Sequence, residues 1–168
     1  MEKAPEYYIR QVLKLADDAL RHGEFPIAAI VVLDDEIIGK SATAEQGQKR
    51  FLVHAELLAL EEADKLGLTP ERRRQTRLYT NLEPCLMCIG AAMSFLLGEI
   101  YYSLESPGDG AVNLVETWAR KKADMPGYVT PKITGGILRA ESIALFKKYV
   151  SICPPGPMRY WASTLTKL

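Results

Sequence analysis

Four residues in two short segments carry the chemistry that this sequence offers. His54 and Glu56 stand two positions apart, and Cys85 and Cys88 follow Pro84 with i, i+3 spacing. One imidazole and two thiolates form three ligands for Zn²⁺, which leaves a fourth tetrahedral position for a water or hydroxide. A carboxylate beside that water can take its proton and return it later. The two segments therefore predict a hydrolytic zinc site with one Zn²⁺ per chain.

Glu56 distinguishes a catalytic zinc site from a purely structural one. A structural site is closed by a fourth protein ligand, and the remaining candidates, His22 and Cys153, have no partner at a characteristic spacing. His22, before Gly23, is expected to cap the end of a helix. Cys153 is expected to be a small buried side chain at a helix end. An open site beside a carboxylate suits attack of hydroxide on an amidine-like ring carbon, followed by loss of ammonia.

Two helix N-termini are expected to position these groups. The apolar pattern predicts one helix over 53–66 and another over 85–97, each followed by a glycine. Cys85 and Cys88 then lie in a first turn on one side of the helix, where the positive end of the helix dipole lowers the pKa of a thiol. His54 also lies at a helix start, so two helix N-termini can converge on one cation.

Strands and helices alternate along the rest of the chain. The apolar run at 26–33, followed by a turn, predicts a hairpin whose central strand is buried on both faces. The other expected elements are helices over 7–20, 111–123 and 138–151, strands over 36–40, 78–82, 100–103 and 128–133, and loops at 47–50, 69–76 and 106–110. This order predicts a single α/β domain over 1–168 with a mixed sheet, in which 154–168 is a candidate cap for the active site.

Composition and charge exclude several other classes of protein. The 168 residues fit one domain, and 48% apolar and 25% charged residues are ordinary for a globular protein. The 21 Lys and Arg balance 21 Asp and Glu, which weakens the case for a strongly basic nucleic-acid surface. Neither a signal peptide nor a membrane-spanning stretch is expected, and the C-x-x-C pair indicates metal or redox chemistry in the cytoplasm.

The segments 53–60 and 78–90 resemble the cytidine and deoxycytidylate deaminase superfamily, in the branch that holds tRNA adenosine deaminases, guanine deaminases and related nucleobase deaminases. The resemblance implies a three-layer α/β/α fold around a five-stranded sheet. It also implies Zn²⁺ bound by His54, Cys85 and Cys88. Members of the superfamily are usually homodimers or larger assemblies, so a homodimer is expected.

The same resemblance implies further site residues. Glu56 is expected to move protons, and the backbone amide of Ala55 and the carbonyls of 82–84 to help hold the substrate ring. Phe25 is a candidate to stack on that ring, although plain core packing is the commoner role of such an aromatic. Glu83 is either a pocket residue or a support for the backbone before the first cysteine.

Three other segments have a structural and a functional interpretation. Tyr160 and Trp161 are either a lid over the site or a fastening of the C-terminal tail to the body of the protein. Arg72–Arg74 is either a solvated charged loop or a contact for RNA phosphate. Asp109, between two glycines, is expected to serve a turn.

The sequence departs from tRNA adenosine deaminases at several positions. Those enzymes typically have an Asn that touches the base where this chain has Thr43, and Asp-Pro-Thr before the His where this chain has 50–53. Glu105 and Ser106 replace an Arg-Asp pair, and the proline-rich segment 154–157 replaces a basic helix. With zero net charge, these departures favour a small aminated heterocycle and disfavour RNA.

The favoured function is a zinc-dependent hydrolytic deaminase that converts an exocyclic amino group of a small base or nucleoside into a carbonyl and releases ammonia. One alternative is adenosine-to-inosine conversion in tRNA, for which Arg72–Arg74 is the best support. Another is a non-catalytic, zinc-stabilised partner subunit, which the presence of Glu56 disfavours. Because loops carry specificity, the sequence does not decide between adenine, guanine, cytosine and less usual rings.

Overall fold

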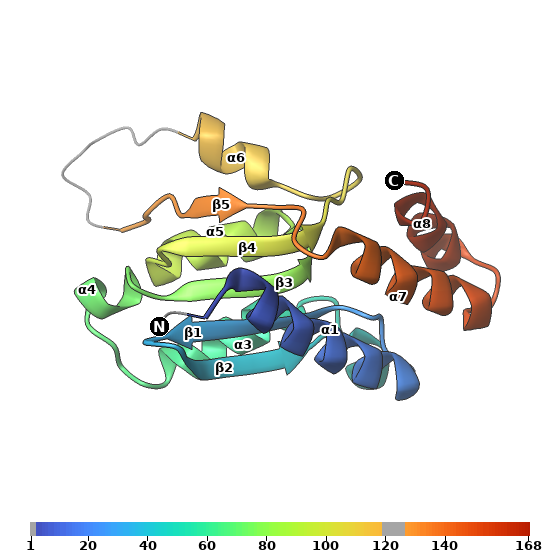
Figure 1. Cartoon of the computed structure of the whole chain (residues 1–168), viewed down its shortest axis with the longest axis horizontal. Helices are drawn as coiled ribbons and strands as arrows, with labels where there is room; N and C mark the ends of the chain where they lie inside the picture. The colour runs from blue at the N-terminus through green and yellow to red at the C-terminus, as the bar shows by residue number, and fades with distance from the viewer. Residues whose placement is uncertain (1–2, 119–126) are drawn as a thin grey trace.

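Five strands form one mixed sheet, and the computed structural model places helices on both of its faces (Figure 1). The structure describes residues 3–118 and 127–168. The strand order is β2-β1-β3-β4-β5, with β1 antiparallel to β2 and β3, and with β3, β4 and β5 parallel. The strands are β1 (Ala28–Leu33), β2 (Glu36–Ala42), β3 (Arg77–Leu82), β4 (Glu99–Leu104) and β5 (Lys132–Thr134).

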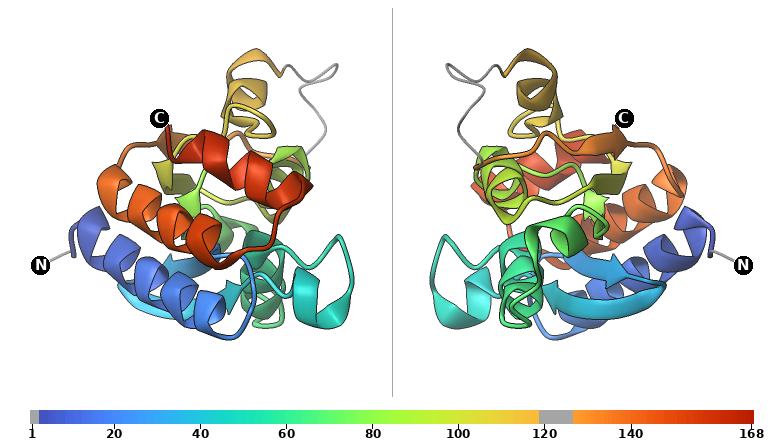
Figure 2. Two further views of the ribbon diagram at one scale, coloured as in Figure 1. Left: turned by 90° about the vertical axis from the view of Figure 1, so that its right-hand side faces the viewer. Right: turned by 90° about the vertical axis from the view of Figure 1, so that its left-hand side faces the viewer.

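The helices form a layer on each side of the sheet (Figure 2), which confirms the predicted three-layer α/β/α fold. α1 and α7 cover one face, and α3 and α5 cover the other. The helices are α1 (Pro5–Arg21), α2 (Glu45–Gln48), α3 (Ala55–Asp64), α4 (Pro70–Arg73), α5 (Leu86–Phe95), α6 (Val112–Thr117), α7 (Arg139–Ile152) and α8 (Pro157–Leu165). Within the described residues, no helix combines the length and the apolar character that crossing a bilayer requires.

β1 is buried on both faces, as its uninterrupted apolar sequence predicts. Ala29 and Val31 face the core under α3 and α5, whereas Ala28, Ile30 and Val32 face the core under α1. Because side chains alternate along a strand, one segment supplies both cores. Each fully buried Val or Ile stabilises the fold by about 1.5–3 kcal/mol relative to an exposed one. This central strand therefore links the cores on the two faces of the sheet.

The hairpin between β1 and β2 turns through two aspartates. Asp34 and Asp35 have φ values of 51° and 63°, both in the left-handed region. Two successive residues of this kind make a type I′ turn, which matches the twist of the strands and tolerates Asp better than most residues. The predicted turn is therefore confirmed.

Two expected loops contain single turns of helix. α2 lies in and before the expected loop 47–50, and α4 lies inside the expected loop 69–76. The start of α4 has sequence signals that a purely polar interpretation overlooks. Thr69 caps it by accepting a hydrogen bond from the backbone N–H of Arg72, and Pro70 occupies the first helical position.

The C-terminal third differs most from expectation. Of the expected extended segment 128–133, only the last two residues belong to a strand, because pairing with β4 is confined to Lys132–Thr134; Tyr128, with a φ of 61°, is not extended. The helix expected over 111–123 is the shorter α6, which ends at Thr117 because Trp118 has an extended backbone; positions 119–123 lie outside the described residues. The expected tail is a helix, because Pro157 stands at a first helical position that suits its fixed φ.

Candidate metal centre and active site

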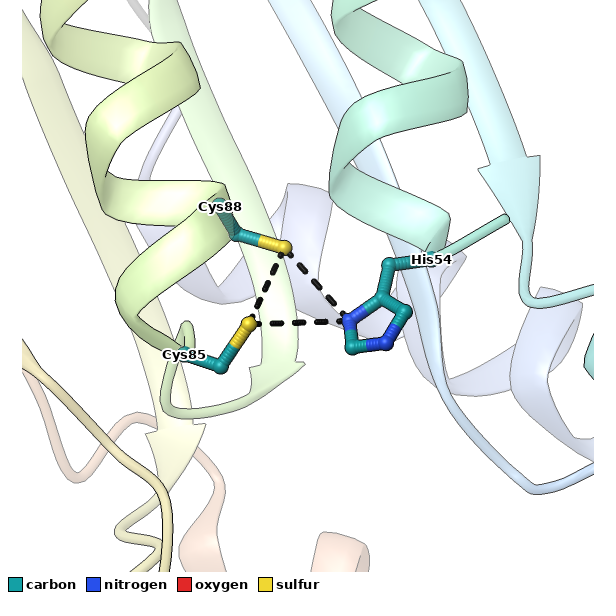
Figure 3. A group of neighbouring side chains, drawn as sticks. All are labelled: His54, Cys85 and Cys88. Atoms are coloured by element: carbon teal, nitrogen blue, oxygen red, sulfur yellow. Dashed lines mark hydrogen bonds between the residues drawn. The ribbon is translucent and has the colours of Figure 1, made fainter. Parts of the chain in front are cut away.

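Three donor atoms meet where α3 and α5 begin (Figure 3). His54 is the N-cap residue of α3, Cys85 is the N-cap residue of α5, and Cys88 lies in the first turn of α5. Nδ1 of His54 is 3.6 Å from the Sγ atom of each cysteine, and the two Sγ atoms are 3.6 Å apart. The two helix N-termini thus converge on one point, as the motif spacing predicts.

The triangle of donor atoms has the dimensions of a tetrahedral zinc site. Bonds of about 2.3 Å to sulfur and about 2.0–2.1 Å to nitrogen separate two sulfurs by roughly 3.8 Å, and sulfur from nitrogen by roughly 3.6 Å. The observed separations, all 3.6 Å, fit those values. Among the described residues, no fourth His, Cys, Asp or Glu joins the cluster. The residues therefore suit a Zn²⁺ ion with one position open.

The three donors shift one another's pKa values. A hydrogen bond from Cys88 lowers the pKa of Cys85 to about 4, and the His54 imidazole contributes to the same shift. The hydrogen bond with Cys85 raises the pKa of His54 to about 9, against the effect of burial. The pKa of Cys88 is raised, because it shares its proton with Cys85 and because it is buried. A thiolate–imidazolium set of this kind releases protons when a metal binds.

Glu56 lies in the first turn of α3 with a buried side chain. Thr80 of β3 donates a hydrogen bond to Oε1 at 3.2 Å, and Oε2 lies 3.5 Å from Sγ of Cys88. Burial raises the pKa of Glu56 above its ordinary value. A carboxyl group with a raised pKa can accept and return a proton near neutral pH.

Two of the three donors, His54 and Cys85, border a cavity of about 440 Å³ beside the carboxyl end of β3. A space of this size accommodates a small heterocycle. The residues singled out from the sequence that line it are Phe25, Thr43, His54, Ala55, Glu56, Glu83, Cys85 and Trp161. Leu82 belongs to the segment 82–84 that was expected to hold the ring, and Pro157 and Met158 belong to the candidate cap 154–168. The lining residues that sequence reasoning missed, or assigned to a turn only, are Ile27, Glu45, Gly108 and Asp109. No spacing signal in the sequence marks that second group.

One wall of the cavity is aromatic and joins distant segments of the chain. Phe25, between α1 and β1, makes edge-to-face contacts with Tyr149 of α7 at 5.6 Å and with Trp161 of α8 at 6.4 Å between ring centroids. Trp161 also packs edge-on against Phe146 at 5.8 Å. Both Phe25 and Trp161 therefore pack in the core and line the cavity, whereas Tyr160 is 75% exposed.

A second wall is the loop between β4 and α6, which Glu83 braces. Its carboxylate accepts hydrogen bonds from the backbone N–H groups of Ser106 at 2.9 Å and Val112 at 3.2 Å. A Cβ atom at Gly110 would lie 2.3 Å from Cδ of Glu83, so only a glycine allows this approach. Glu83 thus lines the cavity and supports this loop, which in turn bonds the backbone at Pro84. Asp109 accepts a hydrogen bond from the Ser106 hydroxyl within the loop, in keeping with the expected turn.

Arg72–Arg74 lies at the opposite end of the sheet from the metal donors. The run follows the C-terminal end of α3 and precedes β3, whereas the donors lie at the start of α3 and beyond the end of β3 (Figure 1). Arg72 pairs with Asp34 of the hairpin turn, and Arg73 pairs with Asp64 of α3. The structure therefore does not bring these arginines to the cavity.

Hydrolytic removal of an amino group from a ring is the reaction class that this fold and site define. The chain belongs to the cytidine and deoxycytidylate deaminase family, whose zinc-binding region matches residues 2–104. That range contains the four motif residues His54, Glu56, Cys85 and Cys88. The resemblance drawn from the two motif segments is confirmed, and the protein is a hydrolytic deaminase that acts on C–N bonds.

Similar proteins are known from sequences and from solved structures. The tRNA-specific adenosine deaminase of Bacillus subtilis (strain 168) is 32% identical over 148 residues, which cover 85% of this chain and 91% of that protein. A structure from a study of A-to-I editing by tRNA:A34 deaminases at the wobble position has a TM-score of 0.68 at 29% identity, covering 83% of this chain and 98% of the other. The structure of a protein in complex with 8-azaguanine has a TM-score of 0.72 at 25% identity, covering 87% of this chain and 84% of the other.

Proposed function

We propose that this deaminase acts on the exocyclic amino group of a small purine- or pyrimidine-type base or nucleoside. One Zn²⁺ is held by Nδ1 of His54 and by Sγ of Cys85 and Cys88, and Glu56 is the catalytic residue. One observation carries the proposal. The buried Glu56 carboxyl lies 3.5 Å from a metal-ligand sulfur and lines the same cavity of about 440 Å³ as two of the three donors.

The chain's own residues move the protons and hold the ring. Zinc, when bound, would supply a water of lowered pKa. Glu56 takes a proton from the attacking water and delivers it to the amino nitrogen. A C–O bond forms, the C–N bond breaks and ammonia leaves, so water and amine become carbonyl and ammonia with no other reactant. The N–H of Ala55, in the first turn of α3 where helix amides lack an intrahelical partner, is placed to bind a ring acceptor.

The character of the cavity wall favours a substrate without phosphate. No lysine or arginine is among the described lining residues. Glu45, Glu83 and Asp109 line the cavity together with Glu56, so a phosphate inside it would face like charges. Phe25, with Trp161 beside it, offers apolar ring surface to a heterocycle. The neighbouring structure that holds 8-azaguanine agrees with a free base as ligand.

Adenosine in tRNA is the second candidate, and the relatives favour it. The Bacillus subtilis protein is named a tRNA-specific adenosine deaminase, and it matches this chain over 85% of its length. A single flipped base fits a cavity without phosphate groups, while the RNA backbone stays outside. Against this candidate, the pairing of Arg72 and Arg73 with Asp34 and Asp64 removes the basic run from the site.

Three further features complete the proposal. α8 closes one side of the active site, which is supported by the presence of Pro157, Met158 and Trp161 in the cavity wall. A homodimer is supported by exposed apolar side chains, such as Phe51 at 87% and Leu52 at 66% exposure. The cytoplasm suits a protein whose metal ligands are two reduced thiols.

Ammonia release tests the function directly. Adenine, guanine, cytosine, their nucleosides and a tRNA transcript are each incubated with the zinc-loaded protein. We expect turnover of a free base or nucleoside, reduced about 10²–10⁴-fold in Glu56→Gln because the proton carrier is lost. Zinc content measured on the same variant is expected to stay at one per chain.

Two outcomes would redirect the proposal. Full turnover by Glu56→Gln would remove Glu56 from the mechanism. Inosine formed in the tRNA alone, with activity that falls steeply as salt rises, would establish the second candidate instead.

A further inference from the structure

Glu45, at the start of α2, contacts the metal ligand His54 from the side opposite the metal donors. Oε1 of Glu45 lies 3.2 Å from Nε2 of His54, while Nδ1 of the same ring faces the two cysteine sulfurs at 3.6 Å. The two ring nitrogens thus have separate partners. The side chains of Glu45 and His54 are 20% and 28% exposed, so water screens this contact only in part.

The backbone holds Glu45 in this position through several independent contacts. The N–H of Ala44 donates to the carbonyl of Val53 at 3.1 Å, which ties the segment before Glu45 to the residue before His54. Thr43 Oγ1 lies 3.4 Å from Oε1 of Glu45 and 3.3 Å from the Val53 carbonyl. The position of the carboxyl group is therefore built into the fold.

The first turn of α2 is fixed from the other side by Glu24. Its carboxylate accepts hydrogen bonds from the backbone N–H groups of Gln46 at 3.0 Å and Gly47 at 2.6 Å. The residues on either side of Glu45 are thus both anchored. A side chain placed so firmly against a metal ligand can set the orientation of that ligand.

A hydrogen bond at Nε2 determines what Nδ1 can do. Neutral imidazole carries one proton, and Nδ1 is free to bind a metal only when that proton is on Nε2. An acceptor at Nε2 therefore selects the metal-binding tautomer, fixes the ring plane and makes Nδ1 a stronger donor. A carboxyl oxygen accepts this hydrogen bond in either of its protonation states.

We propose that Glu45 is a positioning residue for His54, an inference that rests on the proposed zinc site. Glu45 accepts the Nε2–H of His54, and Thr43 supports the carboxyl group in turn. Because Glu45 also lines the cavity, the competing interpretation is a direct contact with substrate. Zinc affinity measured without substrate separates the two, since a substrate contact does not alter it.

The experiment measures zinc affinity by competition with a chelator, and the absorption spectrum of the Co²⁺-substituted protein. Glu45→Ala removes the acceptor, and we expect zinc affinity to fall about 10–100-fold with a changed Co²⁺ spectrum. Glu45→Gln keeps an amide oxygen that accepts the same hydrogen bond, so we expect it to restore most of the affinity. Gln48→Ala, on the same short helix but away from the cavity, is the matched control and is expected to bind zinc like the wild type.

The outcomes separate this inference from the proposed function. Wild-type zinc affinity and an unchanged Co²⁺ spectrum in Glu45→Ala would overturn the positioning role, and a raised KM in that variant would then assign Glu45 to the substrate. An equal loss in Glu45→Ala and Gln48→Ala would also overturn it, because the effect would then belong to α2 as a whole. If no substrate releases ammonia but the zinc affinities follow the predicted order, the function fails while the role of Glu45 is supported.

Discussion

The metal donors and the outer wall of the cavity enclose the same space, yet they are built differently. The donors come from two helix starts, with His54 and Cys85 separated by 31 residues and Cys88 one turn further on. The outer wall is assembled from single residues of distant segments, among them Phe25 before β1 and Trp161 in α8. Local spacing places the donors, whereas the packing of the whole domain places the wall.

The difference separates chemistry from specificity. A helix start fixes the direction of its first side chains within a few residues, so a short motif is enough to build a metal site. A wall made of loops and a terminal helix can change without disturbing the donors, and this is where relatives with one reaction can differ in substrate. Variants on the two sides should therefore have separable effects, on zinc binding in one case and on KM in the other.

The largest effect, a loss of bound zinc, is expected when a donor residue is replaced. Cys88→Ser replaces a buried thiolate by a poor zinc ligand, so we expect stoichiometric zinc to be lost and Tm to fall, since bound metal stabilises the folded state. The affinity loss should exceed the roughly 10–100-fold typical of an outer partner of a ligand. Cys153→Ser is the matched control, because Cys153 contacts Tyr149 and not the donors. Wild-type zinc content in Cys88→Ser would contradict the separation of the two regions.

An intermediate effect is expected from the aromatic wall. Trp161→Ala removes a ring that lines the cavity, and an aromatic contact of roughly 0.5–1.5 kcal/mol corresponds to a KM raised about two- to tenfold. Zinc content should not change. Tyr160→Ala, at the exposed neighbouring position, should leave steady-state kinetics unaffected. If Trp161→Ala lowers zinc content as well as raising KM, the wall and the donors are not independent.

The smallest effect is expected outside both regions, at the contact between α1 and α7. Lys148 donates a hydrogen bond to Asp17 and lowers the pKa of that carboxyl, with a further contribution from Arg21. Because the folded pKa is the lower one, the stabilisation is present above the ordinary pKa of about 3.9 and is lost as pH falls through the folded value. At pH 7 we expect Asp17→Asn to lower the free energy of unfolding by at most about 1 kcal/mol.

Denaturant unfolding across a pH series checks that sign. The difference between wild type and Asp17→Asn should be constant above about pH 5 and shrink as the pH approaches and passes the ordinary pKa of the carboxyl. Asp18→Asn, at the neighbouring position that faces Arg21 rather than α7, serves as the control. A difference that grows on acidification would contradict the assigned contact.

The parts of the fold that sequence predicted share a local cause. The strand at Ala28–Leu33 and the helix starts at His54 and Cys85 follow from apolar periodicity and turn residues within short windows. The turn at Asp34 and Asp35 follows from the tolerance of Asp for the left-handed region. Each of these features depends on neighbours in the chain, and so each leaves a readable pattern.

The parts that sequence did not predict depend on distant partners. The contact of Glu45 with His54 requires α2 to form beside α3. No sequence pattern around Glu45 predicts that contact. Arg72 and Arg73 form a charged run whose partners, Asp34 and Asp64, lie elsewhere in the chain. The sequence did not predict α8, because the prolines before it both end α7 and provide the first position of α8.

X-ray absorption at the zinc edge of the purified, substrate-free protein tests the central claim most directly, because it counts the ligands of the metal. An open site built by His54, Cys85 and Cys88 predicts two sulfurs at about 2.3 Å, one imidazole nitrogen at about 2.0–2.1 Å and one further light atom from solvent. Loss of the imidazole signal in His54→Ala would assign the nitrogen ligand to His54. A shell of four protein donors, or a protein purified under reducing conditions that holds no zinc, would contradict the account.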